Sequence, residues 1–243
     1  MAKYKDLYKW MLLPLVLMQA GIFADYWGDF TDNAWSVHIH YWTGTLWYLY
    51  LIIQPYYATH GQMEKHRTNG IIGMFLAGGV CLTAFSMMYR DIRVADFAAA
   101  NPERMGPFEP WFFFGVMAIE IPMILAFGFA VIQSIRKRKK LEDHAWWLVS
   151  TVFIIMMPAF SRGTQLAYVG LNAEHWPDID IMFPIYGTQA MIILLAILAA
   201  WKYEKLRHPA TFLMVGINLY NCLLEPLGRW ESLQQFFRTI ITG

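Results

Sequence analysis

Long apolar runs are the feature that most constrains how this chain folds. A helix needs about 20 mostly apolar residues to cross a bilayer, and the sequence contains about seven such stretches joined by short polar connections. Hydrophobic residues make up 57% of the chain, whereas a soluble domain has about 45–50% apolar residues. We therefore expect an all-α, polytopic membrane helical bundle of about seven transmembrane helices, folded as a single domain over residues 1–243. The expected spans are Lys9 to Tyr26, Trp35 to Tyr57, Gly70 to Tyr89, Pro110 to Gln133, Ala145 to Tyr168, Met182 to Trp201 and Thr211 to Leu227.

The distribution of charge predicts the orientation of these spans. Lysine and arginine concentrate in the N-terminal tail and in every second connection, while acidic residues concentrate in the remaining connections. Because cytoplasmic connections carry an excess of Lys and Arg, we expect the N-terminus in the cytoplasm and the C-terminus outside, in the inner (cytoplasmic) membrane. The lipid bilayer is then the main partner. We expect no nucleic-acid partner, because the net charge is only +1 and the basic clusters are short and lie beside spans.

Two histidines are each followed four residues later by a glycine, His40 by Gly44 and His66 by Gly70. This spacing places imidazole and glycine on one helical face, where a flat cofactor has room to lie. The structural alternative is that each glycine only lets a neighbouring helix approach closely. A helix rises about 1.5 Å per residue, so His40 and His66 lie at opposite membrane faces and serve separate sites.

His144 begins the fifth expected span on the same membrane face as His66. Both histidines lie near a helix N-terminus, where the helix dipole favours the neutral imidazole that binds iron or zinc. We predict that His66 and His144 are the metal ligands of one cofactor site, with Trp147 beside them. The alternative is that both are interfacial histidines at headgroup level. His60 and His208 share that face and are alternative ligands.

Ionisable residues in the outer half of the bundle form a second candidate site. Glu120 and Arg162 lie at similar depth in the fourth and fifth expected spans, where an isolated charge costs at least about 2.5–3.5 kcal/mol. We expect the two to interact, directly or through a ligand or water, either as a buried pair that fixes helix packing or as part of a functional polar cluster. No residue is assigned a catalytic role. The expected intramembrane polar cluster comprises Asp25, Glu120, Arg162, Gln165, Asn218 and Glu225, with His40 nearby.

These motifs resemble the pattern of an uncharacterised bacterial family of multi-spanning membrane proteins. The resemblance covers about residues 36 to 165, and the family is itself similar to transmembrane b-type cytochromes, in which histidines at helix ends hold haem. Two features depart from the pattern, because no aromatic residue follows Gly70 and Leu148 stands where the family tends to have methionine. The motifs are His40-x-x-x-Gly44, Lys65-His66-Arg67-x-x-Gly70 and His144-x-x-Trp147, followed by the intramembrane Arg162.

Two functions from different classes are consistent with the sequence. The first is an integral membrane redox protein that transfers electrons and holds b-type haem, a quinone-like lipid or both, with His66 and His144 as inner ligands and His40 at an outer site. The second is a non-catalytic subunit that packs against other membrane subunits of a larger respiratory or photosynthetic complex. An intramembrane zinc hydrolase is less consistent, because the last expected span has no histidine. Retinal binding is disfavoured, because no lysine lies in the interior of an expected span to form a Schiff base.

Overall fold

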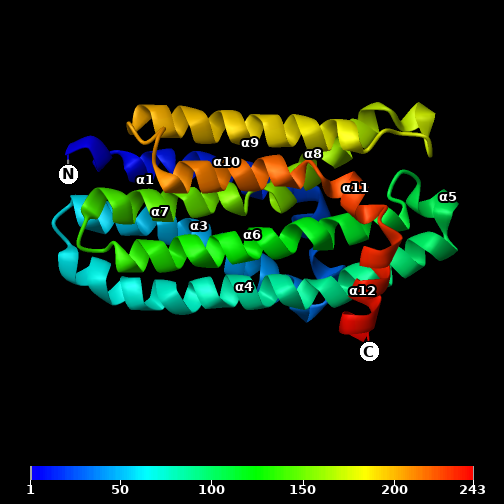
Figure 1. Cartoon of the computed structure of the whole chain (residues 1–243), viewed down its shortest axis with the longest axis horizontal. Helices are drawn as coiled ribbons and strands as arrows, with labels where there is room; N and C mark the ends of the chain where they lie inside the picture. Colours follow the sequence, from blue (N-terminus) through cyan, green and yellow to red (C-terminus); the bar gives the residue numbers. More distant parts are fainter. Residues whose placement is uncertain (1, 243) are drawn as a thin grey trace.

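The computed structural model describes residues 2–242, which fold into helices that run along a common axis (Figure 1). The N- and C-termini lie at opposite ends of this bundle. The all-α fold predicted from the sequence is confirmed. The longest helices are α3 (Trp35–Thr59), α4 (Met63–Ala100), α6 (Pro110–Arg136) and α9 (Met182–Lys202).

Shorter helices complete the bundle. The first rod consists of α1 (Leu7–Trp10), α2 (Leu12–Gly21) and the π-helical turn η2 (Phe23–Trp27). A second consists of α7 (Leu141–Ile154) and α8 (Met157–Leu171), and a third of α10 (Pro209–Asn221) and α11 (Leu224–Gly228). The remaining elements are η1 (Ala2–Tyr4), η3 (Phe30–Asp32), α5 (Pro102–Met105), η4 (Ala173–His175) and α12 (Glu231–Thr242), which crosses the C-terminal end of the bundle (Figure 1).

Four helical segments of the part of the chain described are long and apolar enough to cross a membrane: α4, α6, the consecutive pair α7–α8, and α9. This makes the chain an integral, multi-pass membrane protein. The number is four rather than the seven expected. The first and last expected spans, Lys9 to Tyr26 and Thr211 to Leu227, are each broken into short helices. Helix α3 is long enough, but its many Trp, Tyr and His residues make it less apolar.

Proline determines where several of these helices begin. Pro110 and Pro209 occupy the first positions of α6 and α10, where a missing backbone N–H costs nothing because the helix has no partner for it. The His208 ring caps α10 by accepting a hydrogen bond from the backbone N–H of Ala210 at 3.1 Å. Pro158 lies in the first turn of α8. Because proline donates no bond to the preceding turn, α7 and α8 are separated at Ile155 and Met156 instead of forming one straight helix.

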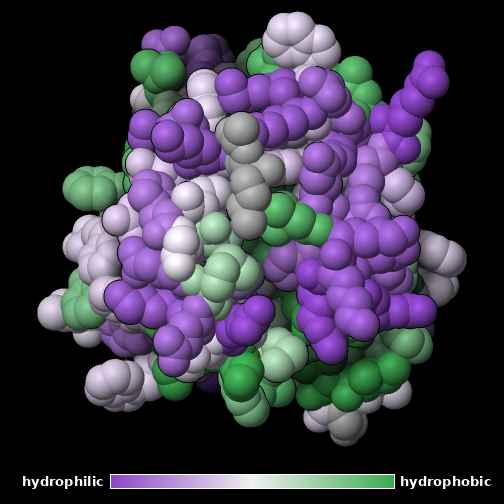
Figure 2. Space-filling model, turned by 90° about the vertical axis from the view of Figure 1, so that its left-hand side faces the viewer, coloured by the Kyte–Doolittle hydropathy of each residue, from purple (hydrophilic) through white to green (hydrophobic). Residues whose placement is uncertain are grey.

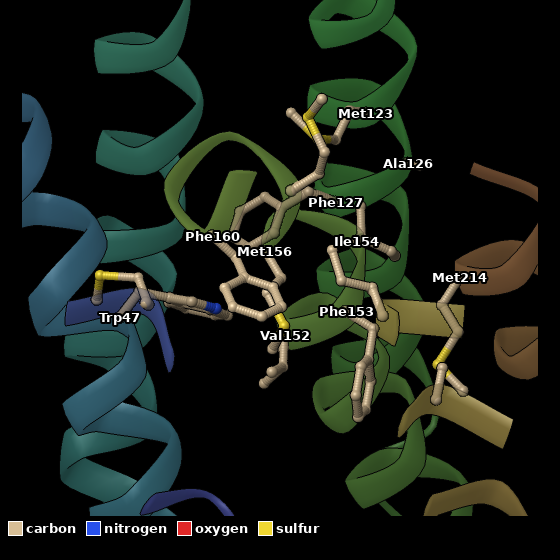
Figure 3. Close-up of a cluster of buried hydrophobic side chains, with 14 of the residues drawn as sticks. Trp47, Met123, Ala126, Phe127, Val152, Phe153, Ile154, Met156, Phe160 and Met214 are labelled. Atoms are coloured by element: carbon tan, nitrogen blue, oxygen red, sulfur yellow. The ribbon is translucent and has the colours of Figure 1, made fainter. Parts of the chain in front are cut away.

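A layer of large apolar side chains fills the centre of the bundle (Figure 3). Trp47 of α3 lies edge to face against Phe127 of α6, with ring centroids 5.0 Å apart, and both side chains are fully buried. Ile154 and Met156, on either side of the α7–α8 break, are also fully buried in this layer. Trp47 also donates a hydrogen bond to Thr151 Oγ1 at 3.2 Å, so its polar nitrogen is satisfied inside the layer.

The sides and one end of the bundle differ in polarity. Large apolar side chains project from its sides, such as Phe75 (79% exposed), Leu82 (72%) and Phe212 (65%). Exposed apolar surface of this extent fits a lipid environment. By contrast, hydrophilic residues cover much of the N-terminal end (Figure 2).

Candidate functional site

His66 and His144 meet at the N-terminal end of the bundle. Each lies at the end of the first turn of its helix, His66 in α4 and His144 in α7. Their imidazole rings are 6.2 Å apart between centroids and nearly perpendicular, at 87°. The two side chains therefore meet, as one shared site would require. The contact forms because α4 and α7 both begin at this end of the bundle.

Ser134, near the end of α6, fixes the orientation of the His144 ring. The ring Nδ1 lies 2.9 Å from the backbone carbonyl oxygen of Ser134, and the Ser134 hydroxyl donates to the His144 carbonyl at 3.1 Å. Nδ1 also lies 2.8 Å from the Ser134 hydroxyl. In the tautomer with the proton on Nδ1, the ring donates to the Ser134 carbonyl and Nε2 keeps its lone pair. A ligating histidine is usually held in this way by its second nitrogen. The His66 Nδ1 is buried and has no hydrogen-bond partner among the described residues.

Both histidines line an inner cavity of about 500 Å³, a volume within the range of ordinary ligand sites. Gly70 also lines it, and a Cβ added there would meet no described atom within 4 Å. Gly70 therefore keeps the space beside His66 open, and close approach of another helix does not explain it. Gly73 is different, because a Cβ there would collide with the Tyr50 ring. Other residues that line the inner cavity are Trp47, Tyr50, Gln54, Arg67, Ser134 and Arg138.

The outer half of the bundle holds a separate polar site, positioned by a close contact between two helices. Gly21 at the end of α2 packs against α8, where a Cβ on Gly21 would collide with the backbone of Ala159. Gly163 packs in turn against the Gly21 backbone. Small residues let membrane helices approach in this way. Because of this approach, Asp25 in the π-helical turn reaches Arg162, the neighbour of Gly163.

Arg162 is paired with Asp25 and not with Glu120. Its Nη1 lies 2.6 Å from Asp25 Oδ2, and Tyr41 donates a second hydrogen bond to the same oxygen at 2.8 Å. The direct form of the expected Glu120–Arg162 interaction is not formed, because the π-helical turn brings a closer carboxylate to the arginine. Glu120 Oε2 is instead buried with no hydrogen-bond partner among residues 2–242.

Glu120 and Arg162 nevertheless face the same space. A cavity of about 110 Å³ is lined by His40, Gly44, Thr83, Arg90, Asp91, Glu120 and Arg162 among others. The His40 Nδ1 lies 3.3 Å from the Thr83 hydroxyl. A second cavity of about 250 Å³ shares Arg90, Asp91, Glu120 and Arg162 and extends to Asp25, Gln165 and Phe108. We call these two spaces the outer cavities. A Cβ on Gly44 would also meet no described atom within 4 Å, so Gly44, like Gly70, opens a cavity.

Three residues predicted for the two sites lie elsewhere. Trp147 packs against Phe129 and His208 on another side of α7 and does not line the inner cavity. Asn218 donates to the carbonyls of Phe153 and Met214, so it joins α10 to α7. Glu225 pairs with Arg229 at 2.8 Å.

The two histidines named as alternative ligands also lie outside the inner cavity. His60 is exposed and stacks on Tyr56. His208 lies 3.6 Å from Asp143, and partial burial lowers the pKa of its imidazole.

Sequence reasoning missed several residues of the outer site. Arg90 and Asp91 were assigned to a connection beyond Tyr89, but α4 continues to Ala100. The sequence did indicate that the helix continues past Tyr89, because Ala84, Met87 and Asp91 have the spacing of one helical face. In the structure these three residues line one cavity. Tyr41 lies in a helix with many aromatic residues, so nothing in the sequence marked it as a residue of the outer site.

The described residues contain no group of three or more His, Cys, Asp and Glu side chains placed to hold a metal ion. Comparison with family models, curated proteins and solved structures finds no match to this chain.

Proposed function

We propose that this chain is an integral membrane redox protein that holds b-type haem between His66 and His144. The observation that carries the proposal is the 6.2 Å separation of the two ring centroids. A metal–nitrogen bond is about 2.0 Å long, so two imidazole rings that shared one ion would have centroids roughly 5–6.5 Å apart. The observed separation falls in that range, so His66 and His144 would be close enough to hold one haem iron.

The surrounding residues fit the same group. The inner cavity has the volume of a cofactor site, and Gly70 leaves the face beside His66 open. Arg67 and Arg138 at its rim have the charge needed to pair with two propionates. Ser134 holds His144 with Nε2 free to ligate. When bound, haem supplies one-electron transfer; the chain binds and orients it and excludes water from the ligands.

The absorption spectrum of the purified protein tests this proposal. We expect a Soret shift and an α-band when dithionite reduces the oxidised protein. A colourless preparation from cells that make haem would overturn the proposal and leave the alternative of a non-catalytic membrane subunit.

A quinone-like lipid in the outer cavities is a second proposal, supported by the apolar walls and polar groups of that space. His40 is its hydrogen-bonding residue, because the ring faces the cavity beside Gly44 and Thr83. We expect His40→Ala to leave the haem spectrum unchanged and to slow haem reduction by a soluble quinol about tenfold, the effect of losing about 1.4 kcal/mol of binding or transition-state stabilisation. His38→Ala is the matched control, because His38 faces Tyr26 instead. Equal effects of the two variants would contradict the proposal.

We further propose that the three rods and the four longest helices, α3, α4, α6 and α9, all cross the membrane, with the N-terminal end in the cytoplasm. The supporting features are the polar N-terminal end (Figure 2) and the basic residues in its connections. A reporter fused at Lys139 should therefore report cytoplasm and one at Asp178 the exterior. Reversed results would invert the orientation, and equal results would mean that the number of spans between them is even.

A further inference from the structure

We infer that Glu120 and Asp91 share one exchangeable proton in the outer cavities, and that this proton enters from the C-terminal end of the bundle. The two carboxyl groups come from neighbouring helices, Asp91 from α4 and Glu120 from α6, and both line both outer cavities. This inference does not depend on a haem at the inner site.

The first observation is the environment of the Glu120 carboxyl group, whose Oε2 is buried without a hydrogen-bond partner among the described residues. An ionised carboxylate in that position would be costly, because burying an unpaired charge costs far more than burying a neutral polar group. Arg162 does not offset this cost by a direct bond, because its short contact is with Asp25.

The charge balance of the outer cavities is the second observation. Besides Glu120, they are lined by two cations, Arg90 and Arg162, and two carboxylates, Asp25 and Asp91. These four charges cancel, so an ionised Glu120 would leave one uncompensated negative charge inside the bundle. One proton bound to the carboxyl pair restores neutrality.

Asp91 shares this proton because it is itself only weakly paired. It is 7% exposed, and its ion contact with Arg90 is 3.9 Å long. Two carboxyl groups in one enclosed site cannot both ionise without repulsion. The other charged or titratable groups that line these cavities are His40, Tyr41 and Tyr48 of α3, Cys81 and Arg90 of α4, Asp25 of the first rod and Arg162 of α8.

The shape of the cavities indicates the direction of entry. The larger outer cavity is lined by Met105 of α5 and by Phe108 in the following connection, both at the C-terminal end. Toward the N-terminal end, the fully buried Trp47, Phe127 and Met156 fill the bundle (Figure 3). The carboxyl pair therefore communicates with only one side of the membrane.

Dicyclohexylcarbodiimide tests the inference in sealed membranes that contain the full-length protein. A protonated carboxyl adds its O–H across one C=N bond of this membrane-permeant reagent, and the product rearranges to a stable N-acylurea with no atom lost. We expect mass spectrometry to find this adduct on Glu120. Its yield should fall several-fold when the solution at the C-terminal end is made alkaline and should not respond to the pH at the other end.

Three variants sharpen the test. Glu120→Gln should abolish the adduct, and Asp91→Asn should lower its yield at a given pH, because removal of the neighbouring negative charge favours ionisation of Glu120. Glu109→Gln is the matched control, since Glu109 precedes the same helix but is exposed and lies 3.8 Å from Arg229. The absence of an adduct on wild-type Glu120, a yield that follows the pH at the N-terminal end, or an Asp91→Asn yield equal to wild type would overturn the inference.

Discussion

Replacement of either His66 or His144 by alanine should abolish the same haem absorption bands. Each variant removes one of the two imidazoles that would hold the haem, and the inner cavity offers no third histidine among its lining residues. Difference spectra of the purified variants measure the effect. We expect complete loss of the low-spin α-band in both, with haem content reduced at least tenfold, equivalent to about 1.4 kcal/mol or more of binding free energy.

Histidines outside the inner cavity serve as controls for this experiment. His60 lies at the same end of the bundle but is exposed and stacked on Tyr56, and His208 contacts Asp143. His60→Ala and His208→Ala should therefore keep the full spectrum. If either control loses the bands while His66→Ala or His144→Ala retains them, the ligand assignment is wrong.

A glycine variant separates loss of haem from loss of folding. Gly70→Leu fills open space beside His66 without a clash against any described atom, so it should exclude haem and leave thermal stability nearly unchanged. Gly73→Leu should unfold more easily, because its side chain collides with Tyr50. Normal haem content in folded Gly70→Leu would show that this face of α4 is not part of the site.

The placement of His66 and His144 at one end of the bundle was predictable because it is set by local sequence. A histidine in the first turn of a helix lies at a membrane face whatever the arrangement of the bundle, so the charge pattern was enough to place His66 and His144 at one end. What sequence did not determine was that the first turns of α4 and α7 come close enough for the two rings to meet, which depends on packing. The same limit explains Trp147, whose helical face turns toward Phe129 and His208.

The outer site was harder to predict because it depends on departures from regular helix. The π-helical turn that carries Asp25 and the break before α8 have no periodic signature, and both change which side chains meet. The Gly21–Gly163 contact joins segments far apart in sequence. Because Glu120 and Arg162 lie at similar depth in their spans, the sequence correctly placed them near each other. It could not show that Asp25 lies nearer to Arg162 than Glu120 does.

The Asp25–Arg162 pair should dominate the stability of the outer half. Removal of one partner from a dry buried pair costs about 3–5 kcal/mol, and about a third of each side chain is accessible here, 34% for Asp25 and 35% for Arg162. Water in the cavities lowers the cost, so we expect Arg162→Gln to destabilise by about 2 kcal/mol, less than a dry pair would lose. Unfolding by SDS in mixed micelles, followed by tryptophan fluorescence, measures this free energy.

A double-mutant cycle separates the pair from its surroundings. The double variant Arg162→Gln with Asp25→Asn should be less destabilised than the two single variants added together, by at least about 1 kcal/mol of unfolding free energy. The reason is that the second change removes a charge that the first change has already left unpaired. The Arg238–Asp96 pair is the matched control, because it has a similar length of 2.7 Å but greater exposure, 43% and 54%. Its coupling should stay within about 0.2–1 kcal/mol.

Glu120→Gln identifies the partner of Arg162. Glu120 shares the outer cavities with Arg162 but forms no direct bond to it among the contacts of the described residues. Its coupling to Arg162 in a second cycle should therefore be smaller than that of Asp25. A protonated Glu120 would lose little on conversion to the neutral, nearly isosteric glutamine, whereas Arg162 would remain bonded to Asp25. A larger coupling for Glu120 than for Asp25 would reverse the assignment and would also mean that Glu120 is ionised in the folded protein.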